Sequence, residues 1–146
     1  ISIKNENIVH QLYALHSLIG MKLSWGNKDE ALILQHKRNK LLQSKNIIQS
    51  IEKTAREDVN KYALEYFKIQ ELTSILGYIE CYLKLGKIDS AATYLEQGLK
   101  LSKEYDGLNH KFIYSSFIEA SFEVDYYAGD YRNLLNTIDN IIDNPD

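Results

Sequence analysis

Pairs of carboxylates offer the first chemistry that this sequence could perform. Glu119 and Glu123 are four residues apart, so they share one face if their segment is helical. Such a pair could act as general acid and general base, provided that a pocket enclosed it and separated the two pKa values. The residues around the pair do not indicate an enclosing pocket, and a solvated helix face is the simpler interpretation.

The residues that bind metals or act as nucleophiles are not spaced for either role. His10 and His16 are six apart, which places them on different faces of a helix, and no H-E-x-x-H sequence occurs. Cys81 has no histidine at the spacing of a known cysteine site, and no serine lies in a G-x-S-x-G sequence. The glycines are isolated and form no phosphate-binding loop. We therefore predict no catalytic residue, no metal and no cofactor, in a protein that is not an enzyme.

The composition of the chain restricts its partners. The 146 residues carry a net charge of −3, and the basic run HKRNK at residues 36–40 is short. Nucleic-acid binding usually needs a clustered basic surface, so we expect none from this chain. The apolar runs are far shorter than the roughly 18 residues that span a bilayer, so we expect no membrane insertion.

The single cysteine bears on the cellular compartment. Cys81 cannot form an internal disulfide and lies in an apolar-periodic stretch, where we expect it to be buried. The lack of disulfides favours the cytoplasm and leaves the periplasm open for a helical domain. The chain begins at Ile1 without a start methionine, and we expect residues 1–146 to form one domain of a longer protein.

The elements that must position these side chains are long helices. Seven glycines and one proline are too few for an all-β fold, which needs frequent turns. Between Leu72 and Leu83, apolar residues recur at the spacing of one helical face, and the same spacing resumes at Ile88. Gly86 lies between the two stretches and suits the positive φ that often follows a helix C-terminus.

Three such glycines divide the chain into helical hairpins. Gly26, Gly86 and Gly129 each follow a periodic stretch, and an acidic residue stands near the start of the next one. An apolar residue stands five positions after each glycine. After Gly86 this residue is Ala91, which we expect to be buried where two antiparallel helices approach closely. The sequence thus predicts an all-α fold, an antiparallel array of αα-hairpins.

The helix boundaries follow from the same periodicity. We expect a loop over residues 104–110, where Gly107 is the stop signal. The boundaries are least defined over residues 44–60, which contain no strong helix breaker, so the third helix is either separate or an extension of the second. The expected helices cover residues 5–25, 28–43, 46–57, 58–85, 88–105, 109–128 and 131–143.

Residues 75–99 resemble a tetratricopeptide repeat (TPR). Tyr82, Gly86 and Ala91 fit the TPR pattern, and Gly98 fits it as a small residue. The resemblance implies a TPR-like α-solenoid, in which the hairpins stack side by side. Two positions depart from the pattern, which usually has a small residue and an aromatic residue there: Ile79 and Leu95.

The two other hairpins match the TPR pattern less well. Around Gly129, the match is degenerate, and the residues at the TPR core positions are Ile118, Phe122, Leu134, Ile138 and Ile141. Around Gly26, the match is poor, and the residues that fit are Leu15, Leu18, Ile19 and Ala31. Three polar residues stand at the remaining core positions of that hairpin: Lys22, Gln35 and Arg38.

The TPR resemblance also implies where a partner would bind. In TPR arrays the first helix of each hairpin lines a concave surface. The chain has 11 tyrosines, which suit recognition, although packing against the next hairpin would explain them equally well. We expect Tyr78, Tyr82 and Tyr94 to pack in the core. The residues that we predict to bind a partner are Tyr13, His16, Glu80, Lys84, Glu119, Glu123, Tyr126 and Tyr127.

The function implied by the resemblance is a non-catalytic module that binds a protein or peptide segment. TPR-like domains in bacteria commonly form the sensory or regulatory part of larger signalling proteins, including transcription regulators and sensor kinases. The predicted binding residues include three carboxylates and one lysine, and this acidic excess favours a basic partner segment. The alternative is a structural spacer or a homodimerisation segment without a ligand, which an exposed apolar stripe over residues 46–70 would favour.

Overall fold

The computed structural model describes residues 8–54 and 62–143, and these residues contain helices and no strand. The predicted all-α class is therefore confirmed. The start of the first expected helix, the end of the third and the start of the fourth lie outside the described residues. The helices are α1 (Ile8–Ser24), α2 (Lys28–Leu42), α3 (Ile47–Thr54), α5 (Ala63–Lys84), α6 (Ile88–Glu104), α7 (His110–Ala128) and α8 (Tyr131–Asp143).

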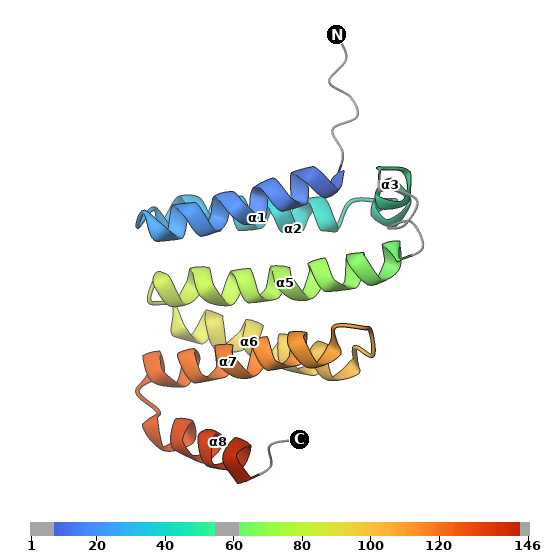
Figure 1. The fold of residues 1–146 in the computed structure, drawn as a ribbon. Helices are drawn as coiled ribbons and strands as arrows, with labels where there is room; N and C mark the ends of the chain where they lie inside the picture. The colour runs from blue at the N-terminus through green and yellow to red at the C-terminus, as the bar shows by residue number, and fades with distance from the viewer. Residues whose placement is uncertain (1–7, 55–61, 144–146) are drawn as a thin grey trace.

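The helices form three hairpins stacked in one direction (Figure 1). α1 and α2 make the first hairpin, α5 and α6 the second, and α7 and α8 the third, with the two helices of each running antiparallel. α3 is a separate helix that contacts α1 and α5. α1, α5 and α7 run in the same direction, and α5 contacts both of the others. The fold thus places the first helices of the three hairpins side by side.

The three hairpin corners are built alike. Gly26, Gly86 and Gly129 follow the ends of α1, α5 and α7, as predicted, with φ values of +78°, +71° and +74°. Glycine adopts this left-handed conformation without the steric cost that other residues incur. The amide of Lys87 donates to the carbonyl of Tyr82 at 2.9 Å, and the other two corners have the equivalent bond. Each corner therefore closes its helix with a Schellman motif.

The main core lies between α5, α6 and α7. Ala91 is fully buried there, as predicted, in one cluster with Leu95 and Phe117. Gly98 lies against the Phe117 ring, and a Cβ at this position would come within 2.0 Å of a ring carbon. Small residues on α6 therefore make room for the large side chains of its neighbours.

The predicted packing of Tyr78, Tyr82 and Tyr94 is confirmed. The rings of Tyr78 and Tyr94 stack with centroids 4.5 Å apart, and Tyr82 stacks on Tyr94 at 5.6 Å. The Tyr78 hydroxyl lies 2.9 Å from Nδ1 of His36 on α2. Burial is the main cause that raises the pKa of Tyr78 to about 12. Tyr78 therefore joins the second hairpin to α2, and Tyr82 and Tyr94 pack against the main core.

The interface between α2 and α5 has a polar middle. Gln35 and Arg38, which depart from the TPR pattern, are buried in it, each with 1% of its surface exposed. The Gln35 amide donates to the carbonyl oxygen and the hydroxyl of Ser74, at 2.9 and 2.8 Å. Nη2 of Arg38 donates to Oε1 of Gln70 at 2.7 Å. We call these four residues the polar seam.

Arg38 is only partly satisfied in the polar seam. Its Nε and Nη1 are buried and have no hydrogen-bond partner among the described residues. Burial is the largest effect on its pKa, which is lowered to about 10, so the guanidinium stays charged at neutral pH. A buried charge with one hydrogen bond costs stability, in contrast to the apolar contacts that surround the seam.

The last hairpin differs from the prediction. α7 buries Ile113, Phe117 and Val124 in the main core, and α8 has no buried residue. The reason is that α8 contacts chiefly α7, and no described helix covers its other side. Leu18 of α1, expected in the core, is likewise 42% exposed. The residues of the last hairpin that we expected in the core, and that are half-buried or exposed instead, are Ile118, Phe122, Leu134, Ile138 and Ile141.

Candidate functional site

All eight predicted binding residues have exposed side chains. They fall into two groups on the three helices that lie side by side. The first group is Tyr13 and His16, on α1. The second group is Glu80 and Lys84 on α5 with Glu119, Glu123, Tyr126 and Tyr127 on α7.

Four members of the second group, Lys84, Glu123, Tyr126 and Tyr127, line a shallow hollow with a volume of about 400 Å³. It lies where the C-terminal parts of α5 and α7 meet the start of α8. We call it the α7 hollow, and its lining residues are Lys84, Phe122, Glu123, Tyr126, Tyr127 and Leu134.

Two lining residues of the α7 hollow were missed as site residues. Phe122 and Leu134 were expected in the core, and instead they are half-buried and give the hollow its apolar lining. The spacing of Phe122 and Tyr126, four residues apart, places them on one helix face and could have identified Phe122. Leu134 comes from the next helix, and only the fold brings it there.

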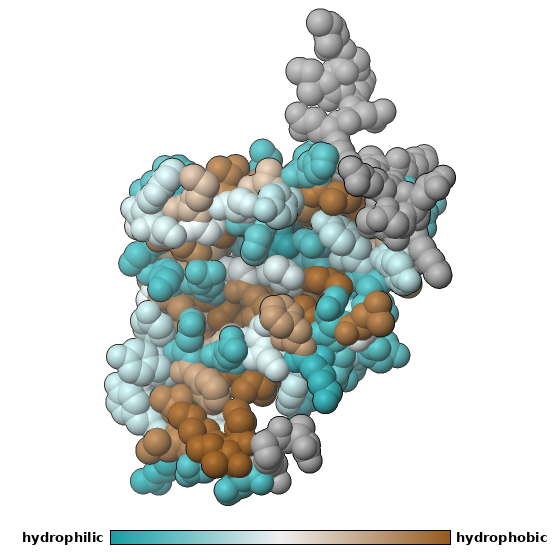
Figure 2. Space-filling model, in the orientation of Figure 1, coloured by the Kyte–Doolittle hydropathy of each residue, from teal (hydrophilic) through white to brown (hydrophobic). Residues whose placement is uncertain are grey.

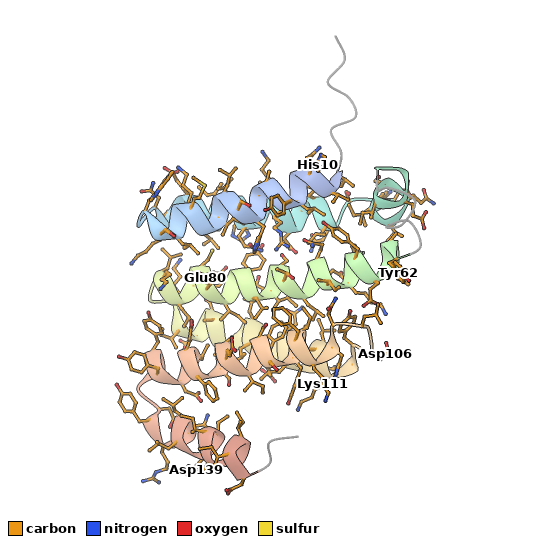
Figure 3. The ribbon with its side chains drawn as sticks, viewed as in Figure 1. His10, Tyr62, Glu80, Asp106, Lys111 and Asp139 are labelled. Atoms are coloured by element: carbon orange, nitrogen blue, oxygen red, sulfur yellow. The ribbon has the colours of Figure 1, made fainter. Side chains whose placement is uncertain are left out.

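The charges beside the α7 hollow are mainly acidic. Partial loss of hydration is the largest cause that raises the pKa of Glu80; Lys84 opposes this, and Glu123 adds to it. Glu80 and Glu123 are therefore near enough to repel each other although they belong to different helices. Glu119 lies one helical turn before Glu123. We call Glu80, Glu119 and Glu123 the acidic stripe, and Figure 3 labels Glu80 on α5.

Exposed tyrosines stand next to the acidic stripe. Tyr126 and Tyr127 are 59% and 46% exposed, and their rings meet edge to face with centroids 5.8 Å apart. Tyr131, at the start of α8, contacts Tyr126 in the same manner at 6.1 Å. The mutual ring contacts hold large aromatic surfaces in place while leaving them open to solvent.

Tyr13 and His16 do not reach the α7 hollow, whose lining comes from α5, α7 and α8. Tyr13 is 71% exposed on α1. Burial lowers the pKa of His16, and the charge of Arg38 lowers it further, so His16 is neutral at neutral pH. This part of the predicted surface is therefore separate and carries no acidic excess.

Two further hollows, of about 220 and 340 Å³, lie where α5 meets α6, the larger also reaching α2. Glu71 and Leu101 line both. Burial raises the pKa of Glu71, and Lys68 partly offsets this effect. Neither residue stands out in the sequence, because each is an ordinary member of its helix and only the packing of α6 on α5 creates the hollows.

The described residues hold no sign of a metal-binding or membrane-spanning site. No group of three or more His, Cys, Asp and Glu side chains there is placed to hold a metal ion. Cys81 is buried, as predicted. None of the helices in this part of the chain combines the length and the apolar character needed to cross a membrane.

Comparison with protein-family models, with curated proteins and with solved structures gives no match for this chain. Its function is therefore inferred from its own residues and their arrangement.

Proposed function

We propose that the chain is a TPR-like, non-catalytic module that binds a protein or peptide segment carrying Lys or Arg next to apolar residues. The observation that carries this proposal is the α7 hollow, where apolar side chains, exposed tyrosines and Glu123 of the acidic stripe lie together. It is concave and partly apolar with few polar groups, which is the usual character of a recognition site.

The order of the helices supports the TPR-like part of the proposal. The second helix of each hairpin contacts the first helix of the next, as α2 does with α5 and α6 with α7. The first helices also contact one another, α1 with α5 and α5 with α7. This pattern, repeated with the same glycine corner, is what a stack of equivalent hairpins produces. α3 and the polar seam are departures from a regular array.

The chemistry of the α7 hollow supports a basic, partly apolar ligand. An apolar side chain of the ligand enters the hollow against Phe122 and Leu134. A Lys or Arg beside it meets the acidic stripe and lies over the ring of Tyr126 or Tyr127, where cation–π attraction adds to the ion pairs. Repulsion between Glu80 and Glu123 in the free protein is relieved when the cation arrives.

The biological role that we propose is regulatory: binding of the segment signals to other parts of a larger bacterial signalling or transcription-regulating protein. Tyr13 and His16 then form a second, separate contact surface on α1. The alternative role, dimerisation through residues 46–70, has less support. Among the described residues of that range, Tyr62 and Leu64 are exposed, while Ile47, Ile51 and Ala63 are buried together in one cluster.

A panel of fluorescent peptides that combine Lys or Arg with aromatic or aliphatic residues tests the proposal. We expect some of them to bind the chain, with an affinity that falls as salt screens the acidic stripe over about 8–10 Å. Glu119→Lys/Glu123→Lys reverses two charges of the stripe and should abolish this binding, as followed by fluorescence anisotropy.

The matched control is Glu52→Lys/Glu96→Lys, which makes the same change of charge at exposed residues of α3 and α6. This control should bind the peptides with little change. Equal losses in both variants would show that only net charge matters, and equal retention would remove the acidic stripe from the site. Either result contradicts the proposal.

A further inference from the structure

The last helix carries an exposed apolar line that the α7 hollow does not use. Tyr131, Leu135, Ile138 and Ile142 are 56%, 59%, 36% and 69% exposed. Their spacing of four, three and four residues places them along one face of α8, and we call this line the α8 stripe. Figure 2 shows apolar surface gathered at the lower end of the array, over α8 and the adjacent part of α7.

The spacing of the α8 stripe, four, three and four residues, is the same in either direction along the helix. A second α8 laid antiparallel along it would place Tyr131 opposite Ile142, and Leu135 opposite Ile138, twice over. A two-fold axis requires this self-complementarity, because the same patch must serve both partners. Each side chain of the stripe then meets an apolar side chain of the second copy.

A second line on α8 supplies the charge complementarity. Arg132, Asn136, Asp139 and Asp143 have the same spacing and flank the α8 stripe. In an antiparallel pair of helices, this flank faces its own copy. Arg132 then meets Asp143 of the second chain, and Asn136 meets Asp139, each twice. A parallel pair would instead set this flank against the opposite one, which contains Leu134, Thr137 and Ile141 and no charged residue of α8.

The groups needed for these contacts are available. Arg132, Asp139 and Asp143 are exposed and form no salt bridge within the described residues. α7 covers a different side of α8, since Nδ2 of Asn133 donates to Asp125 at 2.8 Å and Leu134 is half-buried. Figure 3 labels Asp139 on α8, at the opposite end of the array from His10 on α1. A second chain can therefore approach α8 without displacing the first hairpin.

We propose that a second copy of this chain docks on the α8 stripe in antiparallel orientation and forms a two-fold symmetric dimer. The dimer needs no ligand, and its surface meets the α7 hollow only at the ring contact between Tyr131 and Tyr126. It is also distinct from dimerisation through residues 46–70, because the surface that it uses lies on the last hairpin.

Sedimentation analysis of the chain tests for the dimer. We expect the fraction of dimer to rise with protein concentration over a range that extends to about 0.5 mM, since a short helical interface is of the weak, transient class. Leu135→Glu/Ile142→Glu should weaken dimerisation at least about a hundred-fold, because it buries four unpaired charges. Its helical content should not change, since both side chains are exposed. The control Ile33→Glu/Leu64→Glu alters two exposed apolar residues elsewhere and should leave the dimer intact.

Charge exchange tests the orientation. Arg132→Asp or Asp143→Arg alone should weaken the dimer roughly ten-fold, because each replaces two attractions by two repulsions. The double variant Arg132→Asp/Asp143→Arg should regain dimerisation. A mixture of the two single variants should form heterodimers, in which both pairs attract again.

Three results would overturn the proposal. The first is a chain that stays monomeric at all concentrations up to about 0.5 mM. This result would count against the dimer even if another helix or another protein covered the α8 stripe. The second is a dimer that survives Leu135→Glu/Ile142→Glu. The third is a double charge variant that is no better than the single ones, which would exclude the antiparallel arrangement.

Discussion

Cys81 illustrates at the scale of one residue how burial changes side-chain chemistry. It lies on α5 with no exposed surface, in a cluster with Leu23 and Ala31. Burial is the main cause that raises its pKa to about 12, and the charge of Glu80 adds to the rise. The nucleophilic thiolate is therefore scarce, and reagents cannot reach the sulfur.

We predict that Cys81 does not react with a thiol reagent such as Ellman's reagent in the native protein at about pH 8, where a free cysteine is partly ionised. Reaction should begin only as denaturant unfolds the chain, and its rate should follow the unfolding curve measured by circular dichroism. Rapid labelling of the native protein would contradict the burial of α5 against α1 and α2.

Glycine has opposite effects at two positions of the chain. Gly86 has a φ of +71° at a hairpin corner, whereas Gly20 lies inside α1 with open space where a Cβ would be. Gly86→Ala should lower the free energy of unfolding by about 1 kcal/mol. Gly20→Ala should raise it by up to about 1 kcal/mol, because alanine favours helix. Urea titration of both variants compares the same chemical change in two backbone conformations; effects of equal sign would contradict the corner geometry.

The raised pKa of Glu80 makes the stability of the folded protein depend on pH. Its pKa is raised in the folded protein, so the folded state holds this proton more tightly than the unfolded state. Its contribution to stability therefore increases as the pH falls through the raised value, and is unfavourable at neutral pH. We predict that Glu80→Gln is more stable than the wild type at neutral pH, and that it binds basic peptides more weakly.

The measurement is a series of urea titrations of wild type and Glu80→Gln from about pH 7 down to the range where ordinary glutamates titrate. The difference between the two proteins should shrink on acidification. A variant that is less stable than wild type at neutral pH would show that Glu80 makes favourable contacts, and the acidic stripe would lose one member.

Single residues were predictable from sequence where the cause is local. Gly86 and Ala91 were placed correctly because a helix end and a close approach follow from a few neighbouring residues. The burial of Gln35 and Arg38 was not predictable. Their partners Ser74 and Gln70 are 39 and 32 residues further along the chain, on a helix whose position only the fold defines.

At the scale of elements, helix positions followed from apolar periodicity, and the hairpin connections followed from the three glycines. α3 was uncertain because residues 44–60 contain no proline or glycine. It begins after a turn in which Asn46 has a φ of 62°, a conformation that asparagine tolerates and that the sequence alone does not reveal. The periodicity of α8 was read correctly as helical, but it does not show what covers the apolar face.

Substitutions at two isoleucines can compare how completely α5 and α8 are covered. Ile79 is 2% exposed on α5, and Ile141 is 44% exposed on α8. Ile79→Ala should cost about 2–5 kcal/mol of unfolding free energy, as expected for a buried aliphatic side chain. Ile141→Ala should cost less than about 1 kcal/mol. Thermal or urea unfolding checks both, and similar losses would indicate that α8 is covered as completely as α5.

At the scale of the whole molecule, the polar seam divides the apolar interior. The main core joins α5, α6 and α7, and separate clusters lie at the two ends of the first hairpin. Between those end clusters, Gln35, Arg38, Gln70 and Ser74 meet through hydrogen bonds. The first hairpin is thus attached to the rest of the array by contacts of mixed character.

Arg38 allows the cost of the polar seam to be measured. Arg38→Met keeps much of the apolar volume and removes a buried charge with two unpartnered nitrogens, so we expect unchanged or higher stability. Gln70→Leu leaves the guanidinium without its hydrogen bond and should cost about 1–3 kcal/mol. The double variant should recover most of that loss. A strongly destabilised Arg38→Met would show that the guanidinium is well stabilised where it lies.

The polar seam also affects what happens when the molecule opens. Separation of the first hairpin from α5 exposes amide, hydroxyl and guanidinium groups along the middle of the newly uncovered surface, and water solvates these groups readily. The solvated groups then separate the apolar clusters at the two ends of the hairpin, and we expect the hairpin to close again onto its own α5 before aggregates grow. We expect the native state to recover after repeated heating and cooling, because both faces of the opened interface carry polar groups that water solvates.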